Sequence, residues 1–243
     1  MIREILVVTS GLIILAALAA LVINAVDDRS PGTITHSVGL AQCFQDDELS
    51  ESLTTLKLQM GPDERKVYQS LLAKGRSAPG CRIQLVRALV RVMEQASNPT
   101  NSAQNYFLWE NGAGMLADLK ATEALDLLVA NIDFSSGFES SLNDFPALVA
   151  ILEIGAPAIP KLQIVLRNDS VPHRRKFAAL CIAYIGGTEA RRALTNALPV
   201  ETDPCVKKFL ELSLQAFDNK EKPNHITSAL NGKWLAAFYC LDR

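Results

Sequence analysis

The chain has 243 residues, of which 49% are hydrophobic and 21% are charged, and its formal net charge is −2. This composition supports a packed core and excludes a globally disordered chain. The near-neutral charge provides no broad basic surface, so nothing in the composition indicates a nucleic-acid partner. The five cysteines form no CxxC pair and no Cys/His cluster with zinc spacing, so no metal site is expected.

Residues 5–26 form an uncharged hydrophobic run near the N-terminus. As a helix rising 1.5 Å per residue, the run would extend about 33 Å, enough to cross a bilayer core of about 30 Å. Arg3 precedes the run and Asp27 and Asp28 follow it, so the positive-inside rule places the remainder of the chain outside the cytoplasm. We therefore predict a membrane anchor or signal segment in residues 1–28.

Two main interpretations of this segment stay open. Its length favours a retained single-pass membrane anchor with an extracytoplasmic helical body. Alternatively, cleavage near Ala25 would produce a secreted or periplasmic protein. Both interpretations place the body where disulfides can form. Cys43 and Cys81 are then a candidate disulfide pair, although the sequence alone does not determine the connectivity.

Residues 29–39 are polar and rich in turn-forming residues, which predicts a linker between the membrane segment and the body. From residue 40 onward, apolar residues recur at helical spacing and strand signals are almost absent. The sequence therefore predicts an all-α body.

The first part of this body spans residues 40–114. Helices are expected at residues 65–74, 82–96 and 103–109. Gly75 is expected to end the first of them, and Gly112 and Gly114 to interrupt the chain after the third. We interpret residues 40–114 as a helical N-terminal part or as degenerate repeats.

An internal repeat covers residues 115–218. The segments 119–128, 154–163 and 185–194 align without gaps, at offsets of 35 residues (154 − 119) and 31 residues (185 − 154). Periods of 20–50 residues indicate stacked supersecondary units. Each unit is predicted to contain a first helix, a tight turn and a second helix.

Turn residues at the aligned positions support these units. Gly155, Gly186 and Gly187 are expected to end first helices where a left-handed backbone is needed. Pro157 opens the second helix of its unit, because proline is tolerated in the first helical turn. The first unit lacks a turn glycine.

Three stretches contain an Asp or Pro at the start of a predicted helix, an Ile-Gly turn after it, or both. They are residues 172–194 (PHRRKFAALCIAYIGGTEARRAL), 152–160 (LEIGAPAIP) and 203–207 (DPCVK). The pattern resembles HEAT repeats, and more narrowly the short bacterial HEAT-like repeats named after phycobilisome lyases. The resemblance implies a right-handed α-α superhelix that binds proteins, with no cofactor. The family name also suggests an alternative, namely a cofactor- or chromophore-associated lyase-like factor or enzyme subunit.

The resemblance also implies roles for individual residues. Arg175 occupies the position where an arginine of the family braces neighbouring units against an aspartate, and Asp169 or Asp203 is the expected acceptor. The alternative is that the basic stretch 173–176 binds a phosphate or an acidic partner. Second helices line the concave side of HEAT-like arrays, so partner-binding residues are expected there; a plain solvated face is the alternative. The candidates are Lys161, Gln163, Glu189, Arg191, Arg192 and Asn196.

The three histidines lie in no recognised catalytic motif, so we do not expect an enzyme or a small-molecule substrate. Residues 219–243 contain Trp234, Phe238 and Tyr239 and are predicted to form a capping helix that covers the last repeat. Together these features predict a non-catalytic, membrane-tethered scaffold for an unidentified protein partner.

Overall fold

The computed structural model describes residues 43–96, 103–135 and 142–218, which belong to one compact unit, Ala41–Arg243. All regular structure in these ranges is helical, which confirms the all-α prediction for them. The α-helices are α2 (Asp46–Thr55), α3 (Pro62–Ser77), α4 (Pro79–Ala96), α5 (Ala103–Asp118), α6 (Leu125–Ala130), α7 (Pro146–Ile154), α8 (Ile159–Asn168), α9 (Pro172–Ile185), α10 (Gly187–Ala197) and α11 (Pro204–Asp218). Short 3-10 turns lie at η1 (Thr122–Ala124), η2 (Leu142–Asp144) and η3 (Ala156–Ala158).

Several predicted segments lie outside the described residues. They are the anchor or signal segment (1–28), the linker (29–39) and the capping helix (219–243). Among the described residues, no single helix is both long and apolar enough to cross a membrane. One bent pair, Pro146–Ile154 with Ala156–Asn168, meets the length and composition criteria jointly across a 112° bend.

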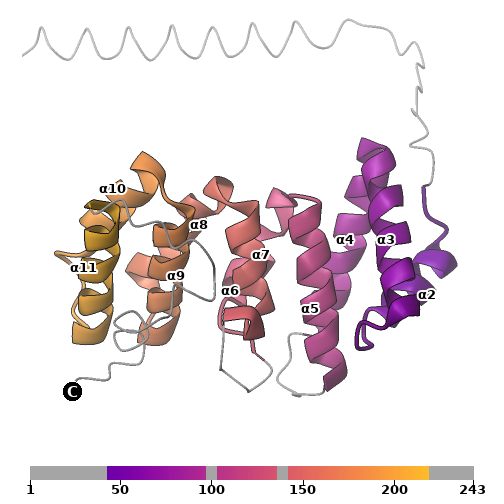
Figure 1. Ribbon diagram of the computed structural model, residues 1–243, viewed down its shortest axis with the longest axis horizontal. Coiled ribbons are helices and arrows are strands. Elements are labelled where there is room, and N and C mark those ends of the chain that lie inside the picture. The colour runs from indigo at the N-terminus through magenta and orange to yellow at the C-terminus, as the bar shows by residue number, and fades with distance from the viewer. Residues whose placement is uncertain (1–42, 97–102, 136–141, 219–243) are drawn as a thin grey trace, which may run out of the picture. The chain divides into compact units, whose positions relative to one another are not determined.

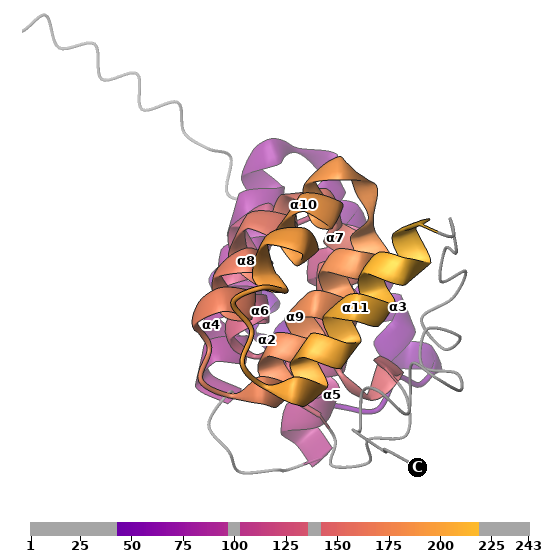
Figure 2. The same ribbon diagram turned by 90° about the vertical axis from the view of Figure 1, so that its left-hand side faces the viewer.

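The helices from α3 onward alternate between two layers (Figures 1 and 2). Helices α3, α5, α7, α9 and α11 form the first layer, and α4, α6, α8 and α10 form the second. The core lies between the layers, where Trp109, Phe177 and Phe209 are fully buried. Burial of these large apolar side chains supplies the main favourable term for packing the layers together.

Glycines inside the first-layer helices allow close packing and do not end the helices. Helix α5 continues through Gly112 and Gly114 to Asp118, so the predicted interruption is wrong. A Cβ at Gly112 would lie 2.7 Å from Sδ of Met93, and a Cβ at Gly75 would lie 2.7 Å from Cδ2 of Leu85. The close packing compensates for the lower helix propensity of glycine, which is about 1 kcal/mol below that of alanine.

The three aligned turns have a positive φ at equivalent positions. Gly155 has φ 83° and ψ −140°, and Gly186 has φ 74° and ψ −170°; both lie close to a region that is essentially restricted to glycine. Gly187 has φ 88°. In the first unit the equivalent residue is Lys120, with φ 49°, the only positive φ of a non-glycine residue in the described chain. A positive φ thus recurs at this position in the unit whose sequence shows no glycine.

A disulfide fixes the start of the body. Cys43 and Cys81, the candidate pair from the sequence, form a disulfide between the entry segment and α4. The adjacent Phe44 is buried, and its backbone N–H and carbonyl both bond to the side chain of Gln84. Cys205 is also disulfide-bonded, whereas Cys181 is a buried free thiol whose pKa is raised by burial.

Candidate functional site: a groove along α5

Two cavities adjoin on the first layer. One has a volume of about 470 Å³ and is lined by residues of α3, α5 and α7 and by the α5–α6 turn. The other has a volume of about 530 Å³ and lies between the α2–α3 connection and the N-terminal half of α5. Tyr68, Glu110 and Gly114 line both cavities, so the two lie next to each other. We call this surface the α5 groove, and its defining residues are Tyr68, Tyr106, Glu110, Gly114, Asp118 and Lys120.

The floor of the groove is one face of α5. Tyr106, Glu110, Gly114 and Ala117 recur every three or four residues and therefore lie along one side of the helix. From Tyr106 to Asp118 this face extends about 18 Å at 1.5 Å per residue. Gly114 has no side chain and Ala117 has a small one, so neither residue fills the groove. The result is an elongated depression of a length that suits several residues of an extended peptide.

Polar contacts close one end of the groove. The Tyr68 hydroxyl donates to Oδ2 of Asp118 at 2.7 Å. Arg76 donates from NH2 to the Asp118 carbonyl at 2.8 Å and lies 3.5 Å from its carboxylate. Burial and the Asp118 carboxylate raise the pKa of Tyr68, so the phenol remains a neutral hydrogen-bond donor. The Asp118 carboxylate therefore has both a hydrogen-bond donor and a cation of the protein beside it.

Lys120 stands at the same end in a strained backbone conformation. Its N–H bonds to the Ala117 carbonyl, and the N–H of Ala121 bonds to the Leu116 carbonyl, both at 2.9 Å. These two bonds form a Schellman motif, in which the residue at the Lys120 position is usually glycine. Its Nζ donates to the Glu153 carbonyl and lies 4.0 Å from the carboxylate. A non-glycine residue in this region costs on the order of 1 kcal/mol, and such residues cluster at functional sites.

Glu110 lies at the junction of the two cavities and differs from the other charged residues of the groove. No cation of the described residues lies within ion-pair distance of its carboxylate. Partial burial, and then repulsion from Asp144 of η2, raise the pKa of Glu110 above its usual range. Burial, Glu110 and Asp144 also raise the pKa of Tyr106 to about 12. Among the described residues, Glu110 thus has no counter-charge at the centre of the groove.

The partner-binding residues expected from the sequence lie on the other layer. Lys161 and Gln163 are on α8, where Lys161 forms an ion pair with Asp126 of α6. Exposed side chains on α10 complete the set: Glu189, Arg191, Arg192 and Asn196. The structure places both groups on neighbouring second-layer helices, and neither lines the α5 groove. Their role in binding stays a prediction.

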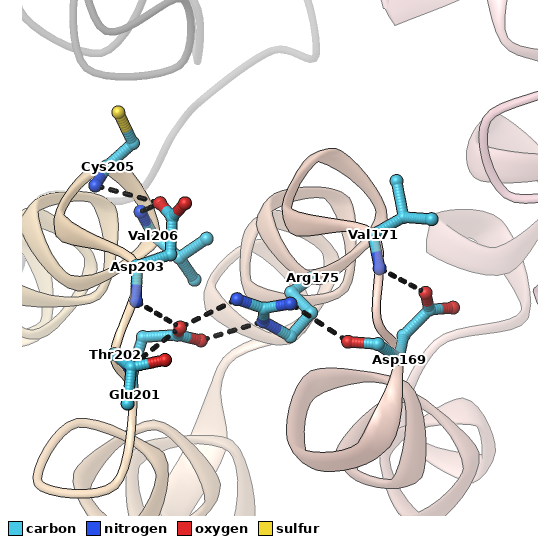
Figure 3. A network of polar contacts seen from close by, with 8 residues as sticks. All are labelled: Asp169, Val171, Arg175, Glu201, Thr202, Asp203, Cys205 and Val206. Carbon is cyan, nitrogen blue, oxygen red and sulfur yellow. Dashed lines mark hydrogen bonds and ion pairs between the residues drawn. The ribbon is translucent and has the colours of Figure 1, made fainter.

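The basic stretch 173–176 makes intramolecular contacts. Arg174 donates to Oδ2 of Asp169 at 2.8 Å and to Oδ1 of Asp133 at 2.9 Å. Arg175 forms a two-point contact with the Glu201 carboxylate, at 2.9 Å and 2.7 Å, and also donates to the Asp169 carbonyl (Figure 3). Of the two expected acceptors, Asp169 accepts from Arg175 only through its backbone carbonyl. The carboxylate that pairs with Arg175 belongs to Glu201 in the α10–α11 connection, so the expected pairing with an aspartate side chain is wrong.

Glu201 and Asp203 organise the entry of α11 (Figure 3). Oε1 of Glu201 accepts from the N–H groups of Thr202 and Asp203, and Oδ1 of Asp203 accepts from the first N–H groups of α11. Burial alone would raise the pKa of Glu201, but the hydrogen bonds from Arg175 and the backbone outweigh it, and the pKa is lowered. These carboxylates thus hold the joint between α9 and α11.

Sequence patterns did not indicate most of the α5 groove. Tyr68, Glu110 and Asp118 are ordinary polar residues of amphipathic helices, and tertiary packing alone brings them together. Lys120 was detectable, because it replaces the turn glycine in the aligned units. Within the described ranges, no group of three or more His, Cys, Asp or Glu side chains is placed to hold a metal ion.

Comparison of the chain with protein-family models, with curated proteins and with solved structures finds no match. The geometry of the α5 groove is therefore the basis for inferring function.

Proposed function

We propose that this protein is a non-catalytic helical-repeat scaffold that binds a segment of another protein in the α5 groove. The observation that supports it best is the pair of adjoining cavities along α5, lined by both aromatic and charged side chains. Aromatic residues combined with a few polar groups are typical of sites that recognise peptides. The alternative of a lyase-like factor has no comparable support among the described residues.

The repeat architecture supports a scaffold role. The aligned turns share a positive φ, and successive helices alternate between two layers, as in HEAT-like arrays. We propose on this basis that the body is an α-α superhelix of the HEAT type. Such arrays commonly offer extended binding surfaces on stacked helices. The groove lies on the first helices, so the proposed binding face differs from the second-helix face expected from the resemblance.

We further propose that residues 5–26 hold this scaffold at a membrane, with the body on the extracytoplasmic side. The disulfide between Cys43 and Cys81 supports this location, because disulfides persist mainly in oxidising compartments. Thiol labelling of Cys43 and Cys81 in intact cells, before and after reduction of the disulfide, tests the location.

Site-specific photo-crosslinking tests the binding face. A photoreactive amino acid replaces Val149, a half-buried groove residue on α7, or Arg192, an exposed residue on α10. In membranes of the native cell, we expect the Val149 probe to yield a crosslinked protein that mass spectrometry can identify. Crosslinks from the Arg192 probe alone would refute the groove and favour the second-layer face. Crosslinks from neither probe would remove the support for a protein-binding scaffold.

A further inference from the structure

The charges in the α5 groove are unevenly compensated. Asp118 accepts hydrogen bonds from Tyr68 and pairs with Arg76, and Glu153 lies beside Lys120. Both cations of the groove are thus engaged by acceptors of the protein itself. Glu110 has no such partner among the described residues, although it lies between the two cavities. Charge complementarity therefore favours a ligand that carries positive charge beside this carboxylate.

The surroundings of Glu110 restrict the form of that positive charge. Tyr106 precedes Glu110 by one helical turn, and Tyr68 borders the same two cavities. Phe107 and Met60 add apolar surface beside them. Lysine and arginine pack their aliphatic stems on such surfaces, and their charged groups are attracted to aromatic rings.

A bare metal ion fits this environment poorly. Cations such as Ca²⁺ require six to eight oxygen ligands, whereas the described residues contain no cluster of three acidic or other ligating side chains. An anionic ligand is also disfavoured, because Arg76 and Lys120 already bond to carbonyl groups of the protein. The remaining class is a long organic cation, which on the proposed function is a side chain of the bound protein segment.

We propose that the α5 groove recognises a lysine or arginine side chain of the bound protein segment, and that Glu110 is its counter-charge. This inference rests on the proposed function, since it identifies the chemistry of the segment that the groove binds. The segment would run along α5, with its basic side chain at Glu110 and its neighbouring residues on Tyr106 and Phe107. Charge complementarity at this one position would then determine which segments bind.

Selection from a random nine-residue peptide library tests this inference. The bait is the full-length protein in detergent, either unchanged or carrying Glu110→Lys. The matched control is Glu94→Lys, which makes the same charge change at an exposed position of α4 in the second layer. We expect the unchanged protein and the control to enrich peptides with a lysine or arginine. Glu110→Lys should lose this preference and enrich peptides with aspartate or glutamate.

A charge swap on one selected peptide completes the test. Replacing its basic residue with glutamate should weaken binding to the unchanged protein roughly tenfold and restore binding to the Glu110→Lys variant. Far-UV circular dichroism must show that each variant is folded, and Glu110→Gln serves as the isosteric second variant. Loss of binding without restoration in the swapped pair would overturn the proposed role of Glu110.

The library also separates this inference from the proposed function. Gly114→Leu fills the floor of the groove and should abolish enrichment if peptides bind there. Enrichment of peptides with no basic preference, still blocked by Gly114→Leu, would overturn the Glu110 inference and leave groove binding intact. No enrichment with the unchanged protein would count against both.

Discussion

Two charged regions of the body differ in how their charges are compensated. At the joint between α9 and α11, Arg175 and Glu201 form a two-point ion pair whose side chains are only 11% and 5% exposed. In the α5 groove, Glu110 has no cation beside it among the described residues and faces the like charge of Asp144. The first region is complete within the protein, whereas the second has a charge that an external group can satisfy. Arg174 and Arg175 of the basic stretch are therefore engaged in contacts within the protein.

Breaking the buried pair should have the largest effect on stability. Glu201→Gln removes the carboxylate charge paired with the largely buried Arg175 and should lower the free energy of unfolding by about 3 kcal/mol. Urea unfolding followed by circular dichroism measures the change. Asp63→Asn provides the matched control, because Asp63 and Lys66 form an exposed pair, and its effect should stay below about 1 kcal/mol. Equal effects at the two sites would show that burial does not distinguish them.

Two glycines of α5 allow the same substitution to be compared at a packed position and at an open one. Gly112→Ala should destabilise the protein by about 1–2 kcal/mol, because overpacking against Sδ of the buried Met93, 2.7 Å from the added Cβ, outweighs the gain in helix propensity. Gly114→Ala should stabilise it by about 0.5–1 kcal/mol, because alanine favours the helix and the nearest atom, Oη of Tyr68, would lie at an ordinary 3.5 Å. Urea unfolding of both variants measures the free energies, and shifts of the same sign would contradict the prediction.

The helical nature of the body was predictable because it depends on local spacing. The apolar face of α4 and the turn after α7 follow from periodicity and from Gly155, both of which act within a few residues. The continuation of α5 through Gly112 was not predictable, since the reason lies in Met93 on another helix. Local propensity predicts that a glycine ends a helix. In the folded protein, the missing side chain of Gly112 instead makes room for a side chain of another helix.

The candidate site was less predictable than the fold. The acceptor of Arg175 is Glu201, which is distant in sequence and arrives through the α10–α11 connection. Likewise, the groove combines α3, α5 and α7, and no sequence spacing relates Tyr68 to Glu110. Lys120 is the exception, because its place in the repeat alignment distinguishes it from the glycines of the other two units.

Relieving the strain at Lys120 should change stability less than breaking the buried pair of Arg175 and Glu201 does. Lys120→Gly should raise the free energy of unfolding by about 1 kcal/mol, because glycine adopts φ near 49° without the steric cost. The ion pair with Glu153 is exposed, so its loss subtracts little. Lys120→Ala is the control that removes the same charge and keeps the strain. If both variants change stability equally, the backbone of Lys120 is not strained.

The mildest perturbation is pH, which should separate the two charged regions without a mutation. Glu110 has a raised pKa, so it takes up a proton as the pH falls through that value, and a lysine-containing peptide should then bind more weakly. Tyr68 and Tyr106 face the same cavity but remain neutral, since their pKa values are raised, and Asp144 carries the like charge on η2. Glu201 behaves in the opposite way. Its stabilising charge is present above its unfolded pKa of about 4.3 and is lost only as the pH falls through its lowered folded value.

There should therefore be a pH range in which the α5 groove has lost affinity for the lysine-containing peptide while the joint between α9 and α11 is intact. Fluorescence anisotropy of a labelled lysine peptide between pH 7 and pH 4 measures binding, and circular dichroism at each pH measures folding. Glu110→Gln should bind more weakly at pH 7 and show no further loss over this range, because its amide does not titrate. If the unchanged protein and Glu110→Gln lose affinity in parallel, a group other than Glu110 controls binding, and the distinction between a completed and an uncompleted charge would not explain recognition.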